Sequence, residues 1–134
     1  MDKQNPKRFS VRAQNGQAMA EFALVLPLLA LLLFGVIQFG IAFNNYITLT
    51  DAVRAGARKA AVARHLNDPE AAVIDQVRTA ATDLKAADLA VDVESSWQPG
   101  EEARVSASYP YRISLLGLVV KSGRLTSVTT ERVE

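Results

Sequence analysis

The longest apolar segment of the chain runs from Phe22 to Phe43 and contains no charged residue. Because an α-helix rises 1.5 Å per residue, a helix of this length would extend about 33 Å, enough to cross the roughly 30 Å hydrocarbon core of a bilayer. A chain of 134 residues could hardly surround a helix that is apolar on every side. The pattern therefore predicts a transmembrane helix over residues 22–43, with Pro27 in its first turns, where membrane helices tolerate proline.

Helical spacing continues beyond this segment, over residues 44–64. No helix breaker separates the two stretches, so we predict one continuous helix from about residue 20 to residue 64. Its outer half is rich in alanine, and charged residues occupy the faces away from one apolar stripe. The stripe comprises Tyr46, Leu49, Val53, Gly56 and Ala60.

A second helix is predicted from residue 69 to about residue 87. Asp68 is a suitable N-cap, Pro69 suits the first helical position, and Glu70 adds an acidic group to the first turn. The apolar stripe of this helix comprises Val73, Val77, Ala80, Ala81 and Leu84.

After the second helix, the apolar residues recur at every second position. Residues 89–94 and 103–109 alternate in this way, and the Gln-Pro-Gly-Glu sequence at 98–101 between them predicts a turn, so together they predict a hairpin. We expect Pro110 to end the second strand. A short apolar run at 115–120, a turn at 121–123 and a final strand at 124–133 complete the expected elements.

The expected fold class is therefore α+β: a long N-terminal helix, a short second helix and about three antiparallel strands. Three parts follow from the pattern: a polar, unstructured head at 1–16, the long helix at 17–64, and a small domain at 65–134. Because 70 residues without a disulfide supply little core, we expect the small domain to pack on the outer half of the long helix.

Charge and composition exclude several functions. The head at 1–16 has a net charge of +3, whereas the rest of the chain has −2, so no basic folded surface suited to nucleic acid is expected. The chain has no cysteine and one histidine, which argues against thiolate or histidine-rich metal sites. No phosphate-binding loop, nucleophile elbow or metal-spaced pair is present. We therefore expect no catalytic residues, no cofactor, no metal and no small-molecule substrate.

The basic head before an apolar segment resembles the start of a secretory signal. Cleavage after Ala42, where Gly40 and Ala42 have small-x-small spacing, would release a secreted binding domain, but it would cut inside a continuing helix. The small residues from Gly16 to Ala20 instead precede the apolar segment. A cut after Gly16 would remove the basic head, leave the helix on the product and make Gln17 the new N-terminus.

Glu21 lies at the threshold of the apolar segment, where a carboxylate is costly unless it is near a helix end or paired. One interpretation is a favourable interaction with the helix dipole, worth about 0.3–1 kcal/mol. The other is an ion pair with the α-amino group created by cleavage, on the same chain or a neighbour. The residues alone leave both open.

Within the transmembrane segment, Gly35, Gln38 and Ala42 recur at helical spacing, and Asn45 extends the stripe. Small and polar residues on one face suit helix–helix packing in membranes. The alternative interpretation is that the membrane helix tolerates small residues at scattered positions, without any packing role.

The segment GQAMAEFALVLPLLALLLFGVIQFG at 16–40 is similar to a class III signal, the type cut by prepilin peptidases. More specifically, it resembles the TadE-like family, the minor pilins (pseudopilins) of the tight-adherence or Flp pilus system. The resemblance extends through NNYITLTDAVRAGARKAAV and weakly into LTSVTTERVE. It implies a pilin-like fold, cleavage between Gly16 and Gln17, and a role for Glu21 and its aromatic follower Phe22 in processing or assembly.

The resemblance also implies a location and partners. The protein would lie in the bacterial inner membrane, in contact with membrane lipid, with residues 44–134 in the periplasm and possible incorporation into the pilus. Its partners would be a prepilin peptidase, other pilins or pseudopilins, and the inner-membrane secretion platform, in the service of pilus biogenesis and cell adhesion. The alternative is an uncleaved bitopic membrane protein that presents a periplasmic adaptor or binding domain.

Overall fold

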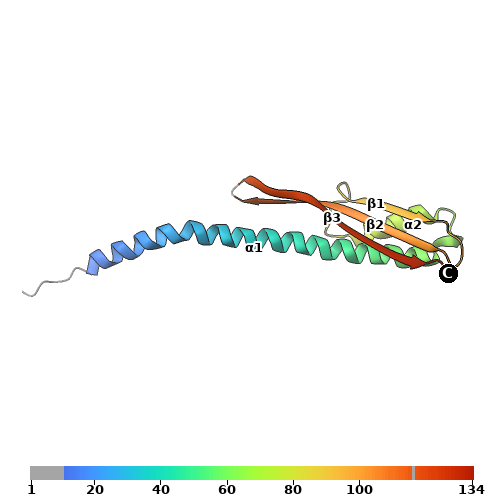
Figure 1. Cartoon of the computed structure of the whole chain (residues 1–134), viewed down its shortest axis with the longest axis horizontal. Coiled ribbons are helices and arrows are strands. Elements are labelled where there is room, and N and C mark those ends of the chain that lie inside the picture. Colours follow the sequence, from blue (N-terminus) through green and yellow to red (C-terminus); the bar gives the residue numbers. More distant parts are fainter. Residues whose placement is uncertain (1–10, 116) are drawn as a thin grey trace, which may run out of the picture.

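The computed structural model describes residues 11–115 and 117–134 of the chain. Helix α1 spans Val11–Val62 and continues into the single 3₁₀ turn η1 at Ala63–His65. The start near residue 20 predicted from the pattern is wrong, as is the unstructured state of residues 11–16, because the helix already begins at Val11. The rest of the predicted head, residues 1–10, lies outside the described residues. Pro27 lies within α1, which curves in its N-terminal third (Figure 1).

Helix α2 spans Pro69–Ala80, and its start is as predicted. The Asp68 carboxylate accepts a hydrogen bond from the backbone N–H of Ala71 at 2.9 Å, so Asp68 is a true N-cap. The predicted end near residue 87 is wrong. Beyond α2, two hydrogen-bonded turns replace the helix, and they carry Leu84 and Leu89 into the core.

The strands β1 (Ala90–Ser95), β2 (Glu102–Leu115) and β3 (Leu118–Arg132) form one antiparallel sheet in the order β1-β2-β3. The predicted β1–β2 hairpin is confirmed, with Val93 opposite Val105 in its register. Together with α1 and α2, the sheet confirms the predicted α+β class.

Two predictions about the second hairpin are wrong. Pro110 does not end β2, because the strand continues to Leu115. It lies beyond Ser108, the last β2 residue paired with β1, so β2 has one partner strand there and tolerates proline as an edge strand does. The expected turn at 121–123 is part of β3, and the chain reverses instead at Gly117, whose φ of 85° favours glycine.

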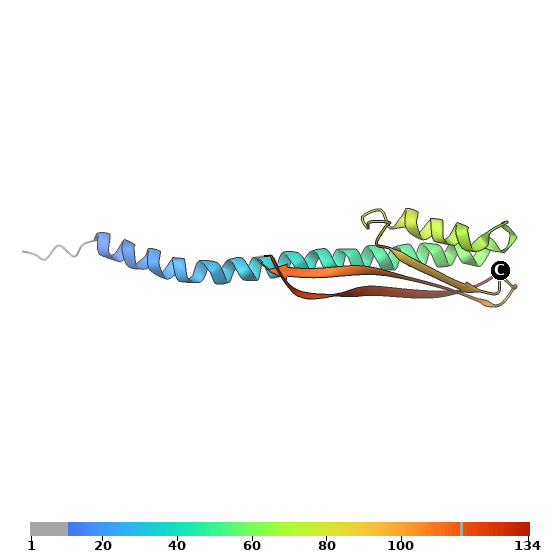
Figure 2. The same ribbon diagram turned by 90° about the horizontal axis from the view of Figure 1, so that it is seen from above.

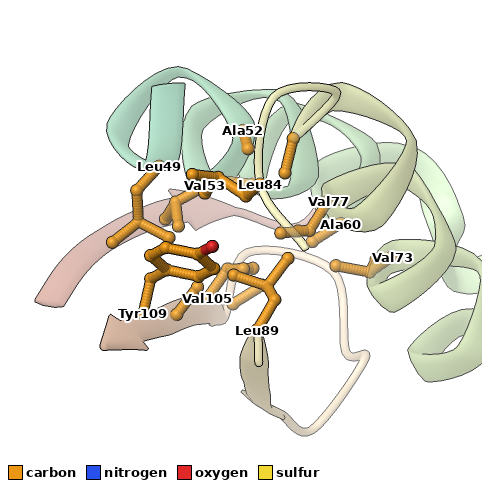
Figure 3. Close-up of a cluster of buried hydrophobic side chains, with 14 of the residues drawn as sticks. Leu49, Ala52, Val53, Ala60, Val73, Val77, Leu84, Leu89, Val105 and Tyr109 are labelled. Atoms are coloured by element: carbon orange, nitrogen blue, oxygen red, sulfur yellow. The ribbon is translucent and has the colours of Figure 1, made fainter. Parts of the chain in front are cut away.

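The core lies where the C-terminal half of α1 contacts both α2 and the sheet (Figures 2 and 3). Small residues on α1 let its neighbours approach closely, and the buried apolar residues of β2 alternate with more exposed polar residues. The C-terminal residues close this unit: Val133 is buried, and the N–H of Glu134 donates to the carbonyl of Ala61 at 2.9 Å. The principal core residues are Leu49, Ala52, Val53, Ala57, Ala60, Val73, Val77, Leu84, Leu89, Ala103, Val105, Ala107, Tyr109 and Val133.

The N-terminal half of α1 projects away from this core, as Figures 1 and 2 both show. The β2–β3 hairpin is much longer than β1 and extends along α1 in the same direction. The molecule is therefore an elongated rod with a compact α+β head at one end.

Candidate assembly segment of helix α1

The projecting half of α1 exposes apolar side chains on every side. In its most apolar 18-residue window, no residue is buried within the protein, and α1 is long and apolar enough to cross a membrane. The exposed large apolar residues of the segment are Met19, Phe22, Leu24, Val25, Leu26, Leu28, Leu29, Leu31, Leu32, Leu33, Phe34, Val36, Ile37, Phe39, Ile41 and Phe43.

The four residues assigned to processing lie together on the exposed first turns of this segment. Gly16, Gln17, Glu21 and Phe22 are all exposed, and a Cβ added at Gly16 would meet no other atom within 4 Å. The head of the protein therefore does not cover the Gly16–Gln17 bond.

Glu21 has a hydrogen-bond partner one turn away. The Gln17 side-chain amide donates from Nε2 to Oε1 of Glu21 over 3.0 Å, in an exposed position. Residue 17 is thus already adjacent to the carboxylate through its side chain. In the full chain Gln17 has no free α-amino group, so the two interpretations of Glu21, dipole partner or amine partner, both stay predictions.

The predicted packing stripe divides into two parts. Gln38 and Ala42 are half-buried and line a cleft of about 430 Å³ between α1 and the protein's own β2. Gly35 lies nearer the N-terminus, and a Cβ added there would meet nothing within 4 Å. The part of the stripe open to another helix is therefore the part around Gly35. Its use in helix–helix packing stays a prediction. The remaining lining residues of the cleft are Ile41, Asn45, Lys85, Asp88, Tyr109, Pro110, Tyr111 and Arg112.

One exposed feature was missed by the sequence reasoning: the tip of the β2–β3 hairpin. The apolar run at 115–120 was recognised, but it was expected to precede a turn rather than to contain one. Leu118, Val119 and Val120 are 75%, 60% and 63% exposed. The glycine at 117, inside an otherwise apolar run, was the available signal for a reversal there.

The described residues contain no cluster of side chains that could hold a metal ion. Within residues 11–115 and 117–134, no group of three or more His, Cys, Asp or Glu side chains comes together. The ion pair found there joins Arg54 and Asp51 on the exposed surface of α1 at 3.5 Å. Such a pair contributes little to stability and indicates no site.

The molecule is thus a small α+β head on a projecting helix that is long and apolar enough to cross a membrane. Residues 16–58 match the sequence model of the family described as TadE-like protein, which confirms the resemblance inferred from the sequence. The match indicates a protein associated with a Tad pilus and with its other pilus proteins. It begins at Gly16 and ends inside α1, so α2 and the sheet lie outside it. No curated protein and no solved structure matches the chain.

Proposed function

We propose that this protein is a minor pilin, or pseudopilin, that acts as a structural component in the biogenesis of a Flp-type pilus. The observation that carries the proposal is the coincidence of the TadE-like match with the exposed apolar half of α1, both of which include Gly16 through Phe43. The proposed role is assembly rather than catalysis, and it uses no cofactor, metal or small-molecule substrate.

In the proposed pathway, a prepilin peptidase cuts after Gly16 and removes the basic N-terminal segment at residues 1–16. Gln17 becomes the N-terminus. The apolar half of α1 then holds the protein in the inner membrane, with the α+β head in the periplasm. The exposed apolar side chains supply the surface through which α1 packs against the helices of other pilins or pseudopilins at the secretion platform. Gly35, where an added Cβ would meet no other atom within 4 Å, permits the closest approach of a neighbouring helix.

Intact mass of the membrane-bound protein tests the cut directly. We expect the wild-type chain to lose residues 1–16 in membranes that contain the prepilin peptidase and to keep them in membranes that lack it. Gly16→Val should block the loss, whereas Gly40→Val is a matched control, because an added Cβ meets no other atom at either position. A full-length mass in the presence of the peptidase would refute the proposal and favour the uncleaved bitopic alternative.

Glu21→Gln tests the assembly role separately from folding. The glutamine oxygen can still accept the hydrogen bond from Gln17, so the substitution removes the charge and retains the local contact. We expect the variant to insert normally but to give a much lower yield of assembled pili. Glu70→Gln, which removes an exposed first-turn carboxylate from α2, is the control. Undiminished pilus yield with Glu21→Gln would reduce Glu21 to a partner of the helix dipole.

A further inference from the structure

The tip of the β2–β3 hairpin carries an exposed apolar cap. Leu118, Val119 and Val120 expose most of their surface, although apolar residues in the body of β2 are buried. Val120 is also the extra residue of a bulge, because Ile113 pairs with Lys121 and Ser114 pairs with Val119. A long hairpin that ends in uncovered apolar side chains is a liability for a protein surrounded only by water.

The base of this tip is level with the end of the transmembrane segment of α1. From Ile113 to its end at Leu115, the strand extends about 7 Å further, at roughly 3.3 Å per residue. Figures 1 and 2 show that this extension runs along α1 toward its N-terminal half. One cleft joins the two elements at that level, and it is lined by Phe39, Ala42, Phe43, Tyr46, Tyr111, Ile113, Lys121 and Leu125.

Basic residues flank the tip at the same level. Arg112 precedes it and lines a cleft with Gln38 and Ala42 of α1, and Lys121 follows it. Between Glu102 and Glu131, the sequence contains Arg104, Arg112, Lys121 and Arg124 and no acidic residue. An apolar cap with basic residues immediately behind it matches the order of acyl chains and anionic headgroups in a lipid leaflet.

We propose that the hairpin tip is a second membrane contact, inserted in the interfacial region of the leaflet where α1 leaves the bilayer. This inference rests on the membrane anchoring of α1 proposed above. Leu118, Val119 and Val120 enter the acyl boundary, and Arg112 and Lys121 bind anionic headgroups. The depth is interfacial because beyond Ser108 β2 has only β3 as a partner, and unpaired strand edges do not occur in the hydrocarbon core. Two contacts would fix the tilt of the head relative to the membrane.

Fluorescence quenching in reconstituted vesicles tests the proposal, and the absence of native cysteine makes single labelling straightforward. The full chain carries an environment-sensitive fluorophore at Leu118→Cys, at Leu32→Cys in α1, or at Thr130→Cys, an exposed site on β3 far from the tip. The vesicles contain phosphatidylcholine and phosphatidylglycerol, with nitroxide lipids labelled at shallow or deep positions.

We expect blue-shifted emission and quenching at Leu118→Cys and Leu32→Cys, and neither at Thr130→Cys. The shallow nitroxide should quench the tip more than the deep one, and the deep nitroxide should quench α1 more. Quenching at Leu32→Cys with a tip that behaves like Thr130→Cys would overturn the inference and leave the anchoring intact. No quenching at Leu32→Cys would refute the anchoring and the inference together.

The basic residues have their own test. Lys121→Glu, or omission of phosphatidylglycerol, should reduce quenching at Leu118→Cys and leave quenching at Leu32→Cys unchanged. The competing occupant is the α1 helix of a second copy. If the tip is quenched by a second copy carrying a nitroxide at residue 32 and not by nitroxide lipids, a second copy covers it and the lipid contact is refuted.

Discussion

Gly56 of α1 lies directly against Val77 of α2, and its replacement tests the packing of the head. A Cβ added there would overlap the side chain of Val77 and would lie 3.4 Å from Cγ1 of Val105 and 3.7 Å from Cγ1 of Val73. All three valines are fully buried, so none can swing into solvent to make room. Overpacking of a core costs about 1–3 kcal/mol, whereas replacing a helical glycine by alanine gains about 1 kcal/mol. We expect Gly56→Ala to lower the free energy of unfolding by about 0–2 kcal/mol.

A double-mutant cycle isolates the steric contribution. Val77→Ala removes two methyl groups at about 0.8 kcal/mol each and leaves a small cavity, so it should cost about 2 kcal/mol alone. In the double variant, the new methyl at position 56 occupies the space vacated at position 77. We therefore expect the double variant to be more stable than the sum of the single variants predicts, by about 1–3 kcal/mol.

The assay is urea unfolding of the full chain in detergent micelles, followed by the fluorescence of Trp97. This residue is half-buried and packs against the core, so its emission reports on the head. Gly35→Ala, whose added Cβ meets nothing, is the control and should leave the midpoint of the head transition unchanged. Strictly additive effects of Gly56→Ala and Val77→Ala would refute the direct contact between these positions.

Three further substitutions give graded expectations in the same urea assay. Asp68→Ala removes the N-cap of α2 and should cost about 0.5–2 kcal/mol, whereas Asp68→Asn should restore most of it; equal losses for both would contradict the capping role. Tyr109→Phe removes the acceptor of the Lys85 backbone N–H, a bond of 3.3 Å, and should cost about 0.5–1.5 kcal/mol; unchanged stability would show that water replaces this bond. Ser108→Ala removes an exposed hydroxyl that accepts from Arg124 and should change stability by no more than about 0.5 kcal/mol; a larger loss would show that this surface contact is part of the core's support.

The sequence predicted the elements whose signals are local. The uncharged run at 22–43, the N-cap Asp68 with Pro69, and the two-residue alternation around Val93 and Val105 each depend on neighbouring residues, and each has its expected counterpart in the structure.

The errors arose where tertiary contacts override local signals. Apolar spacing through Leu84 suggested that α2 continues, but Leu84 reaches the core from a turn, and the following segment places the Lys85 N–H on the Tyr109 hydroxyl. Pro110 resembled a strand end because its tolerance depends on where β1 stops. The reversal at Gly117 lacks polar turn residues, so hydropathy gave no mark of it.

The same distinction between local signals and tertiary contacts applies to the candidate site. The residues around the proposed cut could be identified from the sequence, because they form a short contiguous motif. That Gln38 and Ala42 face the protein's own β2, while Gly35 does not, depends on how far a distant hairpin extends along α1. No pattern within residues 22–43 encodes that length.

The early start of α1 at Val11 has a kinetic consequence for the proposed cut. Within an α-helix, the backbone carbonyl and N–H groups form hydrogen bonds with residues four positions away. A peptidase therefore cannot bind the Gly16–Gln17 bond as an extended substrate. Scission must wait for the first turns to fray, which costs least near a helix end. Glycine lowers the local cost further, by about 1 kcal/mol relative to alanine. Gly16 would thus set the frequency of opening as well as the place of the cut, and strengthening the helix with alanines before it should slow processing without altering the cleaved bond.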